Sequence, residues 1–362
     1  MGDFSGQKSG KKTILRLDKC KIIKKNKSQP KPENQNWKIE CDGKIFYVQP
    51  LIESKKAILQ ELIGSKVARS ILGDHRVDDV HLMKRKDNSL MCASQQIPDF
   101  TNTRVREDLT GFIKSNYNFD LPAAFVPVNK NSPINPKFTF APNNKEVKAF
   151  EDLFITEAFV NHKGAHVANV GVIEPKDSEN VETAILDFDR TDLKSTQLQP
   201  SKGLWNAYKS SLNLCKLIIS INKILDLDVS TLISQVFKEH FYDNDIFKID
   251  EDLKAKEESI IKAFRERQKN LVYVKNRLLA AKDIISNPHA DTESILKKAG
   301  LSSMSQDILR DVMGINYYSM KDFVSIFKHQ HVDLSNDAAC SALDDSGTLP
   351  GSTNDSDLTD FN

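Results

Sequence analysis

The 362-residue chain is predicted to adopt an α+β fold with two lobes followed by a C-terminal all-α region. Residues 13–98 alternate strand-like runs with one amphipathic stretch in the order β-β-β-α-β-β. This order predicts a small antiparallel sheet with one helix in the first lobe. Beyond Pro200 the apolar residues recur at helical spacing, which predicts a mostly helical second lobe and C-terminal region.

The strands of the first lobe are predicted from β-type composition and from turn signals. The clearest turn signal is Asp42-Gly43, a pair that suits a type I′ turn between two strand-like runs. The last two strands form a second hairpin. The predicted strands are Thr13–Ile23, Trp37–Cys41, Lys44–Leu51, Val80–Lys84 and Leu90–Gln95.

One helix of the first lobe is predicted over Ser54–Leu72. Its apolar face consists of residues that are four positions apart, which are Leu59, Ile63, Val67 and Ile71. Gly73 follows this stretch at the position of a C-terminal cap, because glycine readily adopts the left-handed conformation that ends many helices.

The rest of the chain is predicted to contain two short strands and several helices. Residues 101–148 are rich in proline and are expected to contain one helix near Arg106–Ser115. The short strands are expected at Val167–Ile173 and Glu182–Asp187, around a polar turn at 175–180. The other predicted helices are Glu151–Asn161, Leu204–Leu225, Val229–His240, 251–285, 292–300, 305–313 and 319–330.

The C-terminal helices have an apolar repeat of seven residues. It comprises Phe264, Leu271, Leu278 and Ile285, and it predicts a coiled or antiparallel helical-hairpin face. The final thirty residues are too polar to form a core and are expected to be disordered. We therefore expect a basic N-terminal segment with the first strand (1–35), an N-lobe (36–100), a C-lobe (101–245), a helical C-terminal domain (246–331) and a disordered acidic tail (332–362).

Charge and cysteine content limit the class of protein. The net charge is only +1, but residues 1–35 carry ten Lys or Arg, and residues 332–362 carry seven Asp and no Lys or Arg. Such a basic head indicates anion recognition. The five cysteines are scattered and lack CxxC spacing, which predicts a cytosolic protein with neither a disulfide framework nor a zinc site. No run approaches the roughly 18 apolar residues that a membrane-spanning helix needs.

The most informative stretches are 162–172 and 184–189. Asn169 lies in a loop before a short strand, and Asp187 follows the apolar run Ala184–Leu186. Amide and carboxylate oxygens are ligands that Mg²⁺ accepts together with water and phosphate. In phosphoryl transfer a metal held in this way neutralises charge on the transferred group. The residue types therefore predict a metal site with Asn169 and Asp187 as ligands, of the kind used in phosphoryl transfer.

These stretches resemble the kinase loops written H-G-D-x-H-x-x-N and D-x-H-x-x-N-x-G-V. The chain resembles atypical protein-kinase-superfamily effectors of the Legionella type IV secretion (Dot/Icm) class over about residues 37–195. Lys44–Pro50 resembles their F-x-V-K-P strand, and Gln60–Arg69 resembles their E-x-x-A-S-x-x-A-R helix. Cys92–Phe100 resembles the hinge that stacks on adenine. The resemblance implies a kinase-like two-lobed fold.

Three departures from that family pattern affect the expected chemistry. Gln49 stands at the position of the lysine that binds phosphate and pairs with Glu61, so Lys44 or another nearby lysine is expected to substitute for it. The connector 24–35 contains no glycine and therefore cannot form a glycine-rich lid. Gly164 stands where the acid that acts as catalytic base is expected.

The loss of the base at Gly164 does not by itself abolish transfer. A general base contributes about 10²–10⁴-fold, whereas positioning and metal charge dominate phosphoryl transfer. His166 and Asp189 are candidates to take over part of this role. The alternative for His166 is a structural histidine that bonds the loop backbone.

The resemblance implies ATP as cofactor, with Mg²⁺ or Mn²⁺. The implied catalytic residues are His166 and Asp187, and the implied cofactor-binding residues are Glu61, Gln49, Ile97 and Lys44. The expected activity is transfer of the γ-phosphate to a host protein or lipid acceptor. The alternative is a pseudokinase scaffold that binds nucleotide or phosphoinositide without phosphoryl transfer.

The remaining expectations concern partners and location. Residues 19–31 are either a solvated loop or an anion site for inositol hexakisphosphate or another host anion. The charged stretch 251–285 is either a solvated helix face or a phosphoinositide-binding surface for peripheral membrane contact. Nucleic-acid binding is not expected, because the basic head lacks interleaved aromatic residues. We expect a monomer that a type IV system secretes into the host cytosol.

Overall fold

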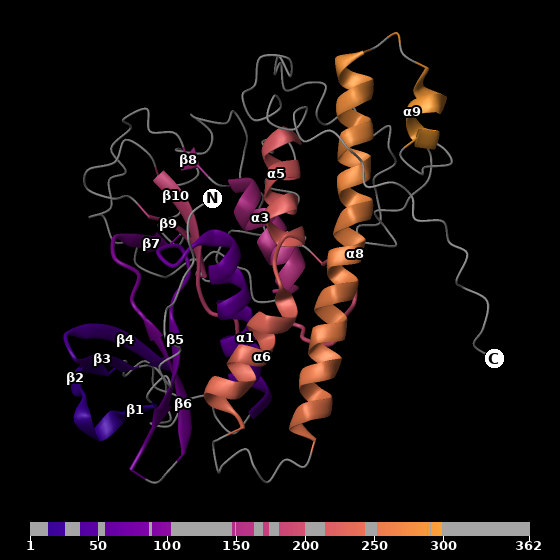
Figure 1. Ribbon diagram of the computed structural model, residues 1–362. Coiled ribbons are helices and arrows are strands. Elements are labelled where there is room, and N and C mark those ends of the chain that lie inside the picture. Colours follow the sequence, from indigo (N-terminus) through magenta and orange to yellow (C-terminus); the bar gives the residue numbers. More distant parts are fainter. Residues whose placement is uncertain are drawn as a thin grey trace, which may run out of the picture.

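The computed structural model describes residues 14–25, 37–49, 55–86, 89–102, 147–148, 150–162, 169–173, 181–199, 214–242, 252–287, 289 and 291–298. These residues form a mixed α+β fold with one six-stranded sheet, a four-stranded sheet and a group of helices beside them (Figure 1). None of the described helices is long and apolar enough to cross a membrane.

The first sheet contains the strands predicted for the N-terminal lobe. They are β1 (Leu15–Arg16), β2 (Lys21–Lys25), β3 (Trp37–Cys41), β4 (Lys44–Gln49), β5 (Val80–Lys84) and β6 (Leu90–Gln95), in the order β1-β5-β6-β4-β3-β2. The prediction of one strand over Thr13–Ile23 is wrong, because the 3-10 turn η1 (Leu17–Lys19) divides it. β1 pairs in parallel with β5, so the sheet predicted to be antiparallel is mixed, and β2 pairs with β3 at the opposite edge.

The Asp42-Gly43 turn between β3 and β4 is confirmed. The φ angles of Asp42 and Gly43 are 51° and 73°, and a type I′ turn requires positive values at both central residues. The register Cys41↔Lys44 closes the hairpin directly around these two residues.

Helix α1 (Lys55–Leu72) follows the first hairpin and packs against α3, α6 and the sheet. Its predicted apolar face is confirmed: Ile63, Val67 and Ile71 are buried in the core, and Leu59 is partly buried against it. Gly73 ends the helix as expected: its φ is 93°, and its N–H donates to the Arg69 carbonyl at 2.9 Å.

The second sheet lies beside the first and has the order β7-β9-β10-β8 (Figure 1). Its strands are β7 (Phe100–Asn102), β8 (Val147–Lys148), β9 (Val170–Ile173) and β10 (Val181–Ile185). β9 and β10 are the two short strands predicted around the polar turn, and they pair in antiparallel register.

The described helices after β8 are α3 (Phe150–Val160), α5 (Leu214–Leu225), α6 (Val229–His240), α8 (Leu253–Ser286) and α9 (Thr292–Lys298). Asp228 caps α6 by accepting hydrogen bonds from the backbone N–H groups of Ser230 and Thr231. α8 is one continuous helix of 34 residues. It runs along the side of the molecule that lies away from the sheets (Figure 1).

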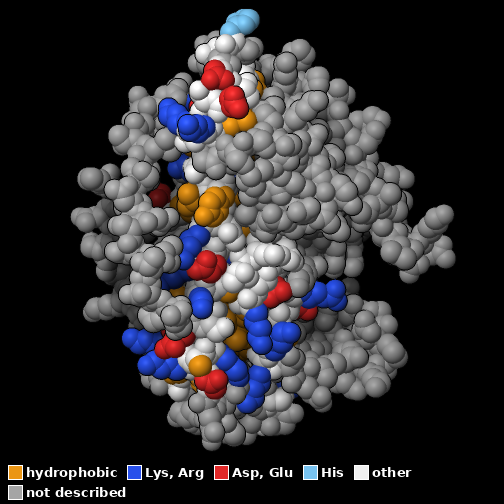
Figure 2. Space-filling view, turned by 90° about the vertical axis from the view of Figure 1, so that its right-hand side faces the viewer, with side chains coloured by type: hydrophobic (Ala, Val, Ile, Leu, Met, Phe, Trp, Pro, Cys, Tyr) orange, Lys and Arg blue, Asp and Glu red, His pale blue; other side chains and the backbone are white. Residues whose placement is uncertain are grey.

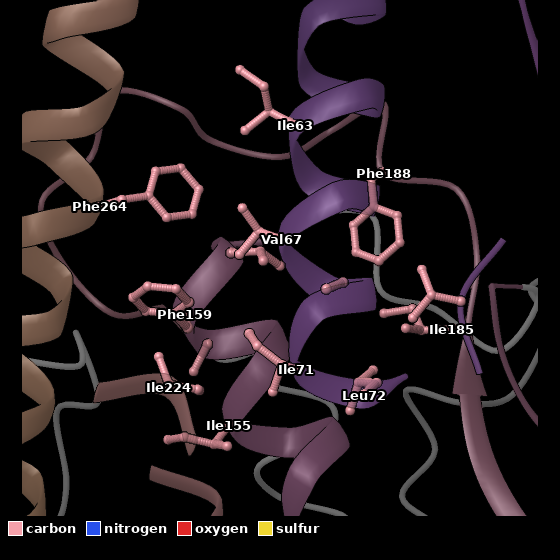
Figure 3. Packing of buried hydrophobic residues seen from close by; sticks show 14 of the residues in the cluster. Ile63, Val67, Ile71, Leu72, Ile155, Phe159, Ile185, Phe188, Ile224 and Phe264 are labelled. Atoms are coloured by element: carbon pink, nitrogen blue, oxygen red, sulfur yellow. The ribbon is translucent and has the colours of Figure 1, made fainter. Parts of the chain in front are cut away.

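A single hydrophobic cluster joins α1, α3, α5, α6 and α8. Figure 3 shows Phe264 of α8 and Phe159 of α3 side by side, next to Val67 of α1. The rings of Phe159 and Phe264 meet edge to face, with centroids 5.4 Å apart. The residues of the predicted seven-residue repeat therefore face the core, with Phe264, Leu271 and Leu278 fully buried.

A second cluster covers the other face of the six-stranded sheet. It is formed by Ile39, Cys41, Phe46, Val48, Met83, Met91 and Ala93. The N-terminal residues Leu15, Leu17 and Cys20 pack against it. The segment β1–η1–β2 therefore packs over this face of the sheet in addition to forming its two edge strands.

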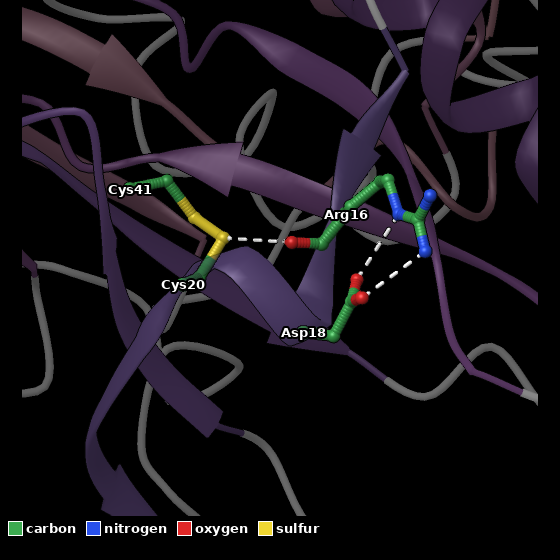
Figure 4. The surroundings of a disulfide bond; sticks show 4 residues. All are labelled: Arg16, Asp18, Cys20 and Cys41. Atoms are coloured by element: carbon green, nitrogen blue, oxygen red, sulfur yellow. Dashed lines mark hydrogen bonds and ion pairs between the residues drawn. A yellow bond between two sulfur atoms is a disulfide. The ribbon is translucent and has the colours of Figure 1, made fainter.

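The prediction of no disulfides is wrong. Cys20 and Cys41 form a disulfide, with Cα atoms 4.7 Å apart (Figure 4). The register Lys21↔Glu40 places them directly opposite each other at the ends of β2 and β3. Only the strand pairing creates this proximity, so scattered cysteine spacing could not reveal it. Cys215 is also disulfide-bonded, and Cys92 is a free, buried thiol.

Several predicted elements lie outside the described residues. These are the helices near Arg106–Ser115, at 305–313 and at 319–330, the first part of Leu204–Leu225, and the acidic tail.

Candidate metal and phosphate site

Asn169 and Asp187 lie together because the β9–β10 hairpin ends between them. Asn169 precedes β9 directly, and Asp187 follows the end of β10 by two residues. The register Ile185↔Val170 brings these ends together. The Leu186 N–H donates to the Asn169 carbonyl at 2.7 Å, and Asn169 Nδ2 donates to Asp187 Oδ2 at 3.2 Å. The two residues predicted as metal ligands are therefore in contact.

The backbone at Asp187 has an unusual conformation. Its φ is 64°, in the left-handed region that aspartate tolerates better than most residues. The next residue, Phe188, is fully buried, and its ring lies 5.0 Å from that of His162. Figure 3 shows Phe188 between α1 and the end of β10. Packing of Phe188 thus fixes the turn that carries Asp187.

The backbone of α1 packs directly against this turn because Gly64 has no side chain. A Cβ at Gly64 would lie 2.5 Å from Thr191 Oγ1 and 2.7 Å from Phe188 Cβ. Neither distance is possible for real atoms, so only glycine allows α1 to lie this close.

Glu61 projects from the same part of α1. Its side chain is 4% exposed, and it accepts a hydrogen bond from the Phe188 backbone N–H. Its Oε2 is buried and has no hydrogen-bond partner among the described residues. Burial holds the pKa of Glu61 well above its usual range, and the charges of Asp78 and Asp187 raise it further.

Asp78 is a site residue that the sequence analysis missed. A parallel bridge between Val77 and Ile185 places it beside the end of β10. Burial raises the pKa of Asp78 to about 7, against the opposing effect of a hydrogen bond from Ser94; the charge of Asp187 adds to the increase. Asp78 lies in a connection without apolar periodicity, so no sequence pattern marked it.

Asp189 completes what we call the acidic cluster, which is Glu61, Asp78, Asp187 and Asp189. Burial raises the pKa of Asp189 to about 6, and its neighbour Asp187 adds to this effect. In the described part of the chain, no lysine or arginine forms an ion pair with Glu61 or Asp187. A cation would therefore relieve repulsion in this cluster.

The donor set fits a divalent cation that phosphate groups help to hold. Among the described residues, no three Asp, Glu, His or Cys side chains converge to hold a metal by themselves. Mg²⁺ commonly takes only one or two protein carboxylates and completes its shell with phosphates and water. Asp187 Oδ1 is buried and has no hydrogen-bond partner in the described part of the chain, so it is available for such a cation.

The other predicted cofactor residues are only partly brought together. Ile97 is buried and clusters with Ile173 and Ala184 of the β9–β10 hairpin. The backbone of Gln49 pairs with that of Cys92. Burial raises the pKa of the Cys92 thiol, and the charge of Glu61 adds to this increase.

Lys44 lies apart from this group. It is exposed at the Asp42-Gly43 turn, five positions before Gln49 and thus roughly 17 Å away along the strand. Gly164, His166 and most of the connector 24–35 lie outside the described residues.

A cavity of about 860 Å³ opens beside Asp189, between the first turn of α1 and the first turns of α8. Its apolar lining residues include Leu59, Phe241 and Ile260. Its charged lining residues are Lys55, Lys56, Asp189, Arg190, Asp192, Lys194, Asp252 and Lys256. The lining therefore contains more cationic than anionic side chains.

The fold and the site define a mixed α+β protein with a candidate metal and phosphate site. No protein-family model matches the chain. No curated protein matches it either. Among solved structures, the chain is similar to the proinflammatory kinase CtkA of Helicobacter pylori. The similarity covers 72% of this chain and 99% of CtkA, with 13% identity and a TM-score of 0.42.

Proposed function

We propose that this chain is an ATP-dependent phosphotransferase of an atypical kinase type. In this proposal Asn169 and Asp187 hold Mg²⁺ or Mn²⁺ on the phosphates of ATP. The observation that carries the proposal is the 3.2 Å contact between these two side chains, next to the buried Glu61 of α1. Protein kinases use an asparagine and an aspartate as metal ligands and a helix glutamate as the partner of a lysine.

The metal would supply the charge neutralisation that Gln49 cannot provide. Phosphoryl transfer depends mainly on positioning and on neutralisation of the phosphate oxygens. The acidic cluster attracts the cation, and the Asn169–Asp187 contact orients both ligands from one hairpin end. Phe100 and Leu186, which are only partly buried and pack against the buried Ile97, are the candidates to contact the adenine ring.

The acceptor in this proposal is a hydroxyl group of a host protein or lipid. Asp189 is the described carboxylate best placed to accept its proton, since it follows Asp187 by two residues and lines the cavity. His166, the other candidate, stays a prediction.

The activity is tested by incubation with radiolabelled ATP and Mg²⁺ or Mn²⁺, with and without host-cell extract. We expect Asp187→Asn to lower incorporation about 100-fold or more. Asp226→Asn makes the same chemical change at an exposed turn and should leave incorporation unchanged. Equal incorporation by wild type and Asp187→Asn would contradict the metal assignment.

One observation favours a second candidate function, a pseudokinase scaffold. Glu61 has no cationic partner in the described part of the chain, whereas active protein kinases pair this glutamate with lysine. A scaffold would bind metal and nucleotide without transfer. Nucleotide binding with no incorporation under any of the conditions above would favour this second candidate.

Proposals about regulation and location rest on charge. A host anion such as inositol hexakisphosphate would activate the protein in this proposal, and the cavity beside Asp189 is a candidate place for it. Calorimetric titration would detect its binding. Figure 2 shows Lys and Arg side chains over the lower part of the face that carries α8. On α8 the exposed Val272 and Tyr273 follow the exposed Lys262, Arg265 and Lys269. This surface suits peripheral contact with an anionic membrane. Type IV secretion stays a prediction from the sequence.

A further inference from the structure

Arg267 of α8 is fully buried, although arginine is rarely found without exposure. Its described hydrogen bonds all go to backbone carbonyl groups. Nη1 donates to Phe159 O and Nε donates to Ser195 O, both at 2.8 Å, and Nη2 donates to Asp192 O. The guanidinium also lies over the Phe264 ring, 4.5 Å from its centroid.

Two of these carbonyl groups belong to the chain segment that follows Asp187, and the third belongs to α3. Phe159 lies at the end of α3, in the segment that leads to Asn169. Asp192 and Ser195 lie in the loop that follows Asp187, which we call the 187–199 loop. One side chain of α8 therefore bonds both segments at once.

Other contacts hold the 187–199 loop along its length. From α1, Gln60 Nε2 donates to the Thr191 carbonyl. From the end of α3, the Asn161 carbonyl accepts the Asp192 N–H at 3.0 Å. From α8, Asn270 Nδ2 donates to the Thr196 carbonyl at 2.9 Å. The loop is thus fixed from three helices, and its anchors on α8 lie one turn apart.

We propose that Arg267 is a positioning residue for the metal and phosphate site. It holds the 187–199 loop against the end of α3, so that α8 helps to fix the loop that begins at Asp187. The effect of these hydrogen bonds on phosphoryl transfer rests on the function proposed above. The hydrogen bonds that join α8, α3 and the loop do not depend on that proposal.

The chemistry of arginine explains why this residue type is needed. A guanidinium presents five N–H donors in one rigid plane and can satisfy three separate carbonyl groups. A lysine ammonium is a compact charge and cannot span them. Burial lowers the pKa of Arg267 to about 10, which leaves the side chain charged at neutral pH.

The test compares Arg267→Lys with Leu271→Ala, a buried change on the same helix that removes apolar packing but none of these carbonyl contacts. Two quantities are measured: hydrogen exchange by mass spectrometry, and the affinity for Mn²⁺·ATP. We expect Arg267→Lys to speed exchange in the 187–199 loop and at the end of α3. We also expect it to weaken Mn²⁺·ATP binding about 10–100-fold, as loss of a supporting contact does at metal sites.

The control should show exchange and affinity changes that follow its loss of stability, without a local maximum in the loop. Asn270→Ala removes only the hydrogen bond to the Thr196 carbonyl and should speed exchange around Thr196 only. If Arg267→Lys and Leu271→Ala give the same exchange pattern, the inference is overturned. If the wild type does not bind Mn²⁺·ATP, the proposed function fails, and the exchange comparison still decides the role of Arg267.

Discussion

At the scale of single residues, the acidic cluster contains buried carboxyl groups whose charges repel one another. Burial and the charge of Asp187 raise the pKa values of Glu61 and Asp78. A group that binds protons more tightly in the folded state than in the unfolded state makes stability depend on pH. The cluster should therefore cost stability whenever its members are ionised and no cation is bound.

The pH dependence of Asp78 provides the first prediction. Its folded pKa of about 7 lies above its ordinary value of 3.8, so the folded state holds the extra proton between these values. Its stabilising contribution is fully present below about pH 4 and is lost as the pH rises through 7. We expect the free energy of unfolding, measured by urea with a chelator present, to fall from pH 5 to pH 8. Asp78→Asn should reduce this fall by about 1–3 kcal/mol.

The control for this measurement is Asp226→Asn, at an exposed turn between α5 and α6. It should retain the pH dependence of the wild type. An Asp78→Asn variant with the same dependence would show that the carboxyl of Asp78 titrates normally.

Gly64 carries the second prediction, because its missing side chain sets the distance from α1 to the turn after Asp187. Gly64→Ala places a Cβ where Thr191 and Phe188 already lie. We expect a loss of about 1–3 kcal/mol in the free energy of unfolding. Mn²⁺·ATP affinity should also fall, because the turn must move.

Ala57→Gly, in the first turn of α1, is a comparison that changes helix propensity without adding a Cβ near the turn. It should lower stability slightly and leave affinity unchanged. Normal affinity in Gly64→Ala would mean that the turn tolerates displacement.

At the scale of elements, local sequence patterns were sufficient to predict the strands, turns and helices whose conformation depends on neighbouring residues. The Asp42-Gly43 turn, the hairpin β5–β6 and the helix before Gly73 follow from turn chemistry and apolar spacing. The contact between Asn169 and Asp187 is likewise local, because the short β9–β10 hairpin joins them, and their role as metal ligands stays a prediction.

Contacts between distant segments could not be predicted in this way. Asp78 joins the site only through the bridge from Val77 to Ile185, and the disulfide depends on the β2–β3 register. The spacing of Arg267, three residues after Phe264 and four before Leu271, places it on the face of the apolar repeat, but the carbonyl groups that it bonds lie in distant segments. These features depend on tertiary pairing, which no single-sequence pattern encodes.

The Cys20–Cys41 disulfide gives a prediction at this scale. It ties β2 to the end of β3 and so secures the cover over the second hydrophobic cluster. Under oxidising conditions we expect Cys20→Ser to lower the free energy of unfolding by about 2–4 kcal/mol. With reductant present, the difference between variant and wild type should disappear. A difference that persists in reductant would assign the effect to packing of Cys20 and not to the bond.

At the scale of the whole molecule, α8 and the helices around α1 share one hydrophobic cluster. The sequence predicted residues 246–331 as a domain of their own, yet Phe264 packs against Phe159 and Arg267 bonds the loop after Asp187. A shared core of this kind should unfold in one cooperative transition together with the site.

Two neighbouring residues of α8 test this cooperativity. Leu271 is fully buried and Val272 is 43% exposed. We expect Leu271→Ala to lower the global free energy of unfolding by about 2–5 kcal/mol. Val272→Ala should change it by less than about 0.5 kcal/mol. Circular dichroism and tryptophan fluorescence should give one coincident urea transition, and two separate transitions would mean that α8 unfolds independently.

The central claim is that Asn169 and Asp187 hold a divalent cation on a nucleotide. Its most direct test is titration of the purified protein with Mn²⁺ and a non-hydrolysable ATP analogue, followed by electron paramagnetic resonance of the bound Mn²⁺. Wild type and Asp226→Asn should bind one Mn²⁺ only when nucleotide is present, because phosphates complete its shell. Asp187→Asn should weaken this binding about 100-fold or more. Equal binding by Asp187→Asn and wild type would contradict the claim.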